Sequence, residues 1–100
     1  MKFVYYRTLL NDDNKKIYDD ILEDLMHYKE SIVINGSDFF TVNKIVDYVR
    51  LDWPELFFVS FEMEIYYTND YVRLVVSYLM SQKEAILKLQ RLNKIIYKRK

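Results

Sequence analysis

The sequence contains no cysteine, and only one histidine, one glycine and one proline. Without cysteine there is no disulfide bond, no thiolate nucleophile and no thiolate ligand for a metal. The motifs of zinc proteases, phosphate-binding loops and α/β-hydrolase nucleophile turns each need two histidines or two glycines. The sequence therefore has no motif for these kinds of metal, nucleotide or nucleophilic chemistry.

The chain also lacks a long apolar run and an excess of charge of one sign. Its apolar stretches are interrupted by Glu62, Glu64 and Arg73, and they are far shorter than the roughly 20 residues of a membrane-spanning helix. Residues 1–7 show no signal-peptide pattern. Fifteen basic and fifteen acidic side chains cancel, so no overall field attracts phosphate or anionic lipid. We expect no membrane insertion.

Large apolar side chains are abundant. In a chain of 100 residues, 51% are hydrophobic and 17% are aromatic. This composition excludes disorder and low-complexity linkers. A chain of this length is served by one hydrophobic core. We therefore expect a single domain over residues 1–100, with no repeat or linker that divides it.

Two segments in the first half of the chain show the apolar spacing of helices. In residues 11–28 apolar side chains recur every three or four positions, and Asn11 is the expected N-cap. Residues 39–51 show the same period, and their candidate caps are Ser37, Asp38 and Thr41. Because the residue before a proline is disfavoured in the α-region, the second helix should end near Leu51.

The segment after residue 80 is predicted to form a third helix. Ser81 and Glu84 make a capping box, in which each side chain can bond a free backbone N–H at the start of the helix. The apolar stripe of this helix still continues at Lys100. Either the end of the helix frays, or the chain is a fragment that was cut just before a downstream domain.

The remaining segments show strand patterns. Residues 31–36 are short, rich in β-branched side chains and closed by an Asn-Gly turn signal. Residues 57–67 and 71–80 alternate, and a tight turn at residues 69–70 gives a hairpin in which paired residue numbers sum to 139. We therefore predict an α+β fold, in the order helix, short strand, helix, β-hairpin, helix, with an antiparallel sheet and helices packed on one face.

The outer face of the hairpin keeps more apolar side chains than an idle surface needs. These are Phe58, Tyr66, Val75 and Leu79. We interpret them as an interaction face for another protein or for a second copy of the chain.

Other candidates for chemistry have simpler explanations. His27 lies near the end of the first helix, where a cation suits the helix dipole. Neighbouring carboxylates such as Glu62 and Glu64 lie on outer faces and not in one cleft. Residues 81–100 carry seven basic side chains and one acidic side chain. Such a segment is compatible with phosphate binding, but basic side chains also stabilise the negative C-terminal end of a helix. We expect no catalytic, cofactor or metal site and no nucleic-acid binding.

Two stretches of the chain resemble a known family. The first lies within residues 5–22, and the second is centred on the run Asp52-Trp53-Pro54-Glu55-Leu56-Phe57-Phe58-Val59. Together they resemble the N-terminal accessory region that precedes the catalytic domain in bacterial transglutaminase-like, cysteine-protease-like proteins, which are often secreted or on the cell surface. The likeness extends over residues 5–95.

The resemblance implies a non-catalytic scaffold domain that packs against a transglutaminase-like catalytic domain in the same polypeptide, outside the cell or at its surface. The family's catalytic Cys, His and Asp belong to that downstream domain, so no catalytic residue is carried over. We interpret the motif as the corner between the second helix and the hairpin, made by Asp52, Trp53, Pro54 and Glu55. The alternative is a stand-alone interaction module, homodimeric through the hairpin face.

Overall fold

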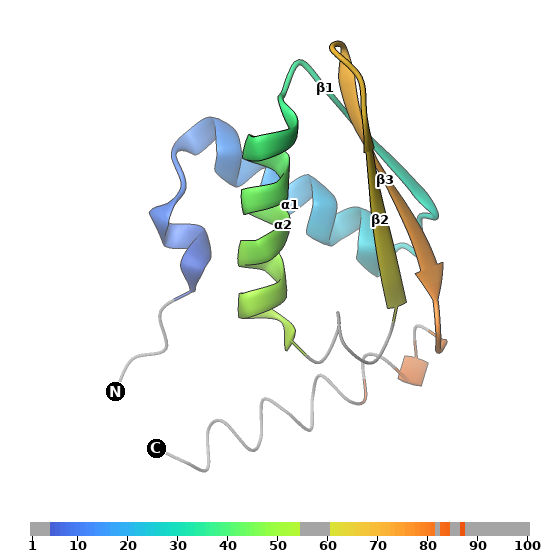
Figure 1. Ribbon diagram of the computed structural model, residues 1–100. Coiled ribbons are helices and arrows are strands. Elements are labelled where there is room, and N and C mark those ends of the chain that lie inside the picture. Colours follow the sequence, from blue (N-terminus) through green and yellow to red (C-terminus); the bar gives the residue numbers. More distant parts are fainter. Residues whose placement is uncertain (1–4, 55–60, 82, 85–86, 88–100) are drawn as a thin grey trace.

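The computed structural model describes residues 5–54, 61–81, 83–84 and 87, which form two α-helices, a short 3-10 helix and a three-stranded antiparallel sheet (Figure 1). The elements are η1 (Tyr6–Leu9), α1 (Asp12–Met26), β1 (Ser31–Asn35), α2 (Phe39–Asp52), β2 (Phe61–Tyr67) and β3 (Tyr71–Tyr78). Figure 1 shows α1 and α2 on the same side of the sheet. The predicted α+β architecture is confirmed. No helix in the described ranges is long and apolar enough to cross a membrane.

Helix α1 begins after the predicted N-cap Asn11, but it ends in a turn that the sequence did not indicate. The side chain of Asn11 accepts a hydrogen bond from the Asn14 backbone N–H at 2.9 Å. At the other end Tyr28, which the apolar spacing placed on the helix, has a left-handed backbone with φ of 61°. The Tyr28 N–H donates to the Leu25 carbonyl and the Lys29 N–H to the Asp24 carbonyl. This is the hydrogen-bond pattern of a Schellman turn, which glycine usually makes.

The side chain of Tyr28 is held against the sheet. Its ring stacks on the ring of Tyr78 with centroids 4.1 Å apart. The Tyr78 hydroxyl in turn donates to the Lys29 carbonyl at 2.6 Å, and burial raises the pKa of Tyr78 to about 12. We infer that this stacking offsets the strain of about 1–2 kcal/mol that a left-handed backbone imposes on a residue with a Cβ.

Helix α2 starts and stops at polar residues. Of the three candidate caps the structure uses Asp38, whose carboxylate accepts from the Thr41 N–H at 2.8 Å and from the Thr41 hydroxyl at 2.9 Å. These bonds hold the pKa of Asp38 below its usual value. The helix ends at Asp52, one residue beyond the predicted end, and the Trp53 N–H still donates to the Val49 carbonyl.

The hairpin has the predicted register. Pairs run from Phe61 opposite Tyr78 to Tyr67 opposite Val72, and each pair sums to 139. The short strand β1 pairs with the other side of β3, from Ser31 opposite Val75 to Asn35 opposite Tyr71. The strand order is therefore β1-β3-β2, with β3 in the centre.

The core lies between the helices and the inner face of the sheet. The sheet contributes alternate side chains, among them Val72, Leu74 and Val76 of β3, all buried. The helices contribute their apolar stripes, and the buried members are Tyr18, Ile21, Leu25, Val42, Ile45, Val46 and Val49. Ser81 accepts from the Glu84 N–H at 3.2 Å, as the capping box predicts. Residues 57–60 of the predicted hairpin and nearly all of the third helix lie outside the described residues.

The short helix η1 is attached to α1 by an exposed ion pair. The Arg7 guanidinium donates to both carboxylate oxygens of Asp19, at 2.8 and 2.7 Å. These hydrogen bonds hold the pKa of Asp19 below its usual value. Because both side chains are exposed, solvent screens the pair and its effect on stability is small.

We expect Arg7→Gln to raise the pKa of Asp19 toward the ordinary value near 3.9, measured by NMR titration of its carboxyl carbon. A depressed native pKa stabilises the fold above the unfolded pKa, and this contribution is lost as the pH falls through the native pKa. The free energy of unfolding of the variant should therefore depend less on pH in this acidic range. Arg50→Gln is the control, because Arg50 contacts Asp47 instead. An unchanged Asp19 titration in Arg7→Gln would contradict the assignment.

Candidate protein-binding surface

The face of the sheet opposite the helices carries no described element, and we call it the open face. Because strand side chains alternate, its residues follow from the register and from burial. They are Ser31, Val33, Asn35, Glu62, Glu64, Tyr66, Tyr71, Arg73, Val75 and Ser77. The open face thus carries aromatic, aliphatic and charged side chains of both signs.

Arg73 lies at the middle of the open face. It pairs with Val33 on one side and with Tyr66 on the other, and its guanidinium carbon lies 5.8 Å from the centre of the Tyr71 ring. The side chain of Val33 is 45% exposed and that of Tyr66 53%. This part of the face combines an arginine with exposed apolar surface.

Tyr66 is oriented by its neighbour on the same strand. Its hydroxyl donates a hydrogen bond to the Glu64 carboxylate, which raises the pKa of Tyr66. Since β2 places Glu64 two residues before Tyr66, both side chains lie on the open face. The Tyr66 ring therefore has a defined position and is exposed to a partner.

The structure does not place all four residues of the predicted interaction face together. Tyr66 and Val75 lie together on the open face, with Val75 half-buried and diagonal to Tyr66 across the hairpin. Leu79 follows β3 directly and is 57% exposed. Phe58 lies outside the described residues. Val33 was missed, because its place next to Arg73 depends on the pairing of β1 with β3, for which the sequence has no signal.

Asp52, one of the four predicted corner residues, accepts hydrogen bonds from two other elements of the fold. It is buried, and its carboxylate accepts hydrogen bonds from the Tyr6 N–H at 2.7 Å, the Arg7 N–H at 3.1 Å and the Tyr18 hydroxyl at 2.7 Å. The three donors come from η1 and α1, whereas Asp52 ends α2. This carboxylate therefore joins three elements of the fold.

Trp53 extends the same network. Its indole N–H donates to the Tyr18 hydroxyl at 3.1 Å, and its ring stacks on Tyr5 with centroids 5.8 Å apart. Burial and the hydrogen bond to Asp52 raise the pKa of Tyr18 above its usual value. Pro54 is half-buried, and Glu55 lies outside the described residues. The polar groups of this network are directed at one another, which favours a structural role.

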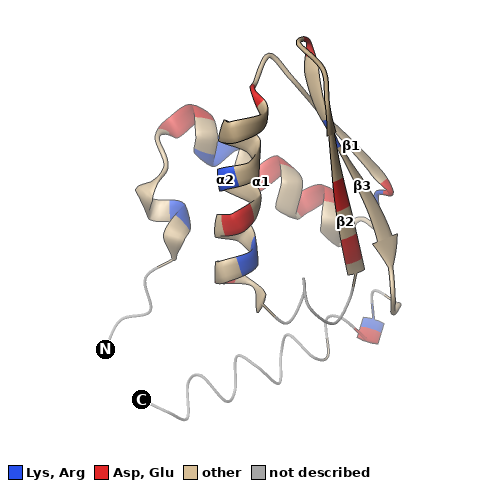
Figure 2. Cartoon of the chain, viewed as in Figure 1, with Lys and Arg blue, Asp and Glu red and all other residues tan. Residues whose placement is uncertain are grey.

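The remaining titratable groups are dispersed. The Nδ1 atom of His27 is 2.8 Å from the Glu23 carbonyl oxygen, in an exposed position at the end of α1. Figure 2 shows acidic residues spread along α1 and on β2. Within the described ranges no three histidine or carboxylate side chains are placed to hold a metal ion. The open face is therefore the candidate functional surface.

Comparisons with protein-family models, with curated proteins and with solved structures give no match for this chain. The likeness to the accessory region of transglutaminase-like proteins thus rests on the sequence alone and stays a prediction.

Proposed function

We propose that this chain is a non-catalytic protein-binding domain that packs through its open face against a folded protein. The exposed apolar side chains on this face, Tyr66 and Val33, carry the proposal. A sheet face that is idle in water ordinarily shows polar side chains at these positions. Tyrosine and arginine are also the residues that protein interfaces concentrate near their centres.

The charges of the open face favour a protein over a nucleic acid. Glu64 lies diagonal to Arg73 on the neighbouring strand, and Glu62 lies on the same face further along that strand, so the face has no positive field. A phosphate backbone needs a surface of basic side chains. A protein surface can match acidic and basic groups together, which gives an interface specificity.

The partner that the sequence favours is a catalytic domain of the transglutaminase type in the same polypeptide. The support is the likeness over residues 5–95, which includes the Asp52–Glu55 corner. A second copy of the chain is the other candidate. In a twofold dimer the same face meets itself, and Arg73 of one copy can then approach Glu64 of the other.

A photo-crosslinking amino acid at position 66 tests the proposal in the cells that make the protein. Position 51 is the control, because Leu51 is as exposed as Tyr66, at 54% against 53%, and lies on α2. We expect a crosslink from position 66 that position 51 does not give. Peptides of a Cys-His-Asp catalytic domain would identify the accessory role, and peptides of this chain a homodimer. Equal products from the two positions would contradict the proposal.

Tyr66→Thr should weaken binding to the identified partner about tenfold or more, because a central tyrosine commonly contributes about 2 kcal/mol to an interface. Threonine suits an exposed strand position, so we expect the fold to persist. Leu51→Gln removes a comparably exposed side chain from α2 and should leave the affinity unchanged. Sedimentation or calorimetry measures both. An equal loss in the two variants would mean that the open face is not the binding surface.

A further inference from the structure

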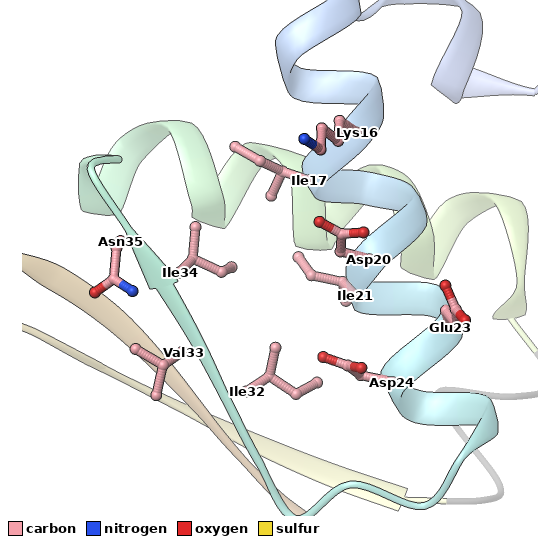
Figure 3. A pocket seen from close by; sticks show the side chains of 10 residues that line it. All are labelled: Lys16, Ile17, Asp20, Ile21, Glu23, Asp24, Ile32, Val33, Ile34 and Asn35. Atoms are coloured by element: carbon pink, nitrogen blue, oxygen red, sulfur yellow. The ribbon is translucent and has the colours of Figure 1, made fainter.

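A groove of about 350 Å³ separates α1 from β1 (Figure 3). Its floor is made of four isoleucines, of which Ile21 and Ile32 are buried, while Ile17 and Ile34 are half-buried. Figure 3 shows Ile32 and Ile34 pointing from the strand toward the helix. The floor is therefore apolar and partly accessible from outside.

The helix side of this groove is acidic. Asp20, Glu23 and Asp24 line it from α1, against one basic side chain, Lys16. In Figure 3 the Asp24 side chain points from α1 toward β1. In the part of the chain that the structure describes, no basic group lies within ion-pair distance of these three carboxylates. The groove therefore combines an apolar floor with an excess of negative charge, three carboxylates against one lysine.

The strand side of the groove is a free edge of the sheet. Among the described residues β1 pairs with β3 alone. The Val76 N–H donates to the Glu30 carbonyl, and the Gly36 N–H donates to the Asp70 carbonyl, so the even-numbered residues of β1 face β3. Because the direction of backbone groups alternates along a strand, those of Ser31, Val33 and Asn35 point outward. Such an edge is a template for a further strand.

We propose that this groove binds an extended segment of a partner protein, which pairs with β1 as a fourth strand and carries apolar and basic side chains. The backbone of the segment bonds the outward groups of Ser31, Val33 and Asn35, as in other cases of strand addition. Every second side chain of the segment faces α1. Apolar side chains there contact the isoleucine floor, and a lysine or arginine lies beside Asp20 and Asp24.

This site is separate from the one in the proposed function. The open face binds a folded surface on one side of the sheet, whereas the groove binds an extended chain at its edge, on the helix side. The partner chemistry also differs, because the groove needs positive charge. Tyr66→Thr should therefore leave binding in the groove unchanged, so a failure of one proposal can be told from a failure of the other.

The first experiment uses a display library of random peptides and selects those that bind the full chain. We expect enriched peptides in which lysine or arginine alternates with apolar residues. In NMR, such a peptide should shift the amide signals of Ser31, Val33 and Asn35. N-methylation at alternate peptide positions should abolish binding, since only alternate N–H groups face β1, while methylation at the other positions is tolerated. No enrichment, equal tolerance at all positions or a helical bound peptide would overturn the proposal.

The second experiment tests the charges. Asp20→Asn/Asp24→Asn should weaken binding of the enriched peptide about tenfold or more at low salt, with a smaller difference at high salt. Asp47→Asn/Asp70→Asn removes the same charge from α2 and from the hairpin turn, and should change the affinity less than about twofold. Similar losses in both variants would show that only the overall charge matters and would contradict the assigned site.

A proline at position 33 tests the edge itself. Because the Val33 N–H points outward, Val33→Pro removes no hydrogen bond within the sheet but takes away a donor for the added strand. We expect loss of peptide binding with the β1–β3 pairing retained in the NMR spectra. If the variant does not fold, the N-methylated peptides decide the same question. Full affinity in a folded Val33→Pro would overturn the strand-addition geometry.

Discussion

Replacing Asp52 with alanine is expected to lower the free energy of unfolding by about 3 kcal/mol or more. The substitution leaves the backbone N–H groups of Tyr6 and Arg7 and the hydroxyl of Tyr18 without the carboxylate that accepts from them. A buried donor such as the Tyr18 hydroxyl costs about 1–3 kcal/mol when it loses its partner, and the part-buried N–H groups of Tyr6 and Arg7 add to this loss. The total free energy of unfolding of a small domain is only about 5–15 kcal/mol, so this one substitution removes a large share of the stability.

Urea unfolding followed by circular dichroism measures this loss. Asp47→Ala is the matched control, because Asp47 is an exposed aspartate on the same helix and should cost about 0.5 kcal/mol or less. The loss of stability from Asp52→Asn should fall between the losses from Asp52→Ala and Asp47→Ala, since an amide retains one acceptor oxygen. If Asp52→Ala and Asp47→Ala unfold at the same urea concentration, the network has no role in stability.

Replacing Leu74 with alanine is the other substitution with a large expected effect. Leu74 is completely buried at the centre of β3, opposite Ile32 on one side and Ile65 on the other. Truncating a buried leucine costs about 3–5 kcal/mol, through lost burial and the cavity that remains. We expect the Tm to fall by about 12 °C or more, since each kcal/mol shifts the Tm of such a domain by about 4–8 °C.

The neighbouring residue provides the control for Leu74. Val75 lies on the open face and is half-buried, so Val75→Ala should cost about 1 kcal/mol. Differential scanning calorimetry of both variants measures the contrast. A loss from Val75→Ala that equals the loss from Leu74→Ala would contradict the assignment of inner and open faces.

The hairpin was predictable because its determinants are local. The tight turn at residues 69–70 sets the pairing, and a shift by one residue would turn Leu74 and Val76 away from the core. The same locality explains the caps at Asn11 and Asp38, each of which acts on a backbone N–H three residues later. The open-face positions of Tyr66 and Val75 follow directly from this register.

The features that the sequence did not indicate depend on distant contacts. Nothing in residues 31–35 tells which strand they pair with, so Val33 and the free edge of the groove could not be placed. The hydrogen bond from Tyr6 to Asp52 joins residues 46 positions apart. The left-handed backbone at residue 28 could not be predicted, because the residue is a tyrosine and not a glycine. The stacking of Tyr28 on Tyr78, which belongs to another element, stabilises this conformation.

The position of β1 in the sheet has a consequence for the order of folding. The partners in the β2–β3 hairpin are close in the sequence, whereas β1 must find β3 across the whole of α2 and β2. Closing that longer loop costs more chain entropy, and contacts between distant residues slow folding. The hairpin therefore offers an early nucleus, and β1 docks on it late. The strand that forms the proposed groove is then the last to join the sheet and the first to leave it.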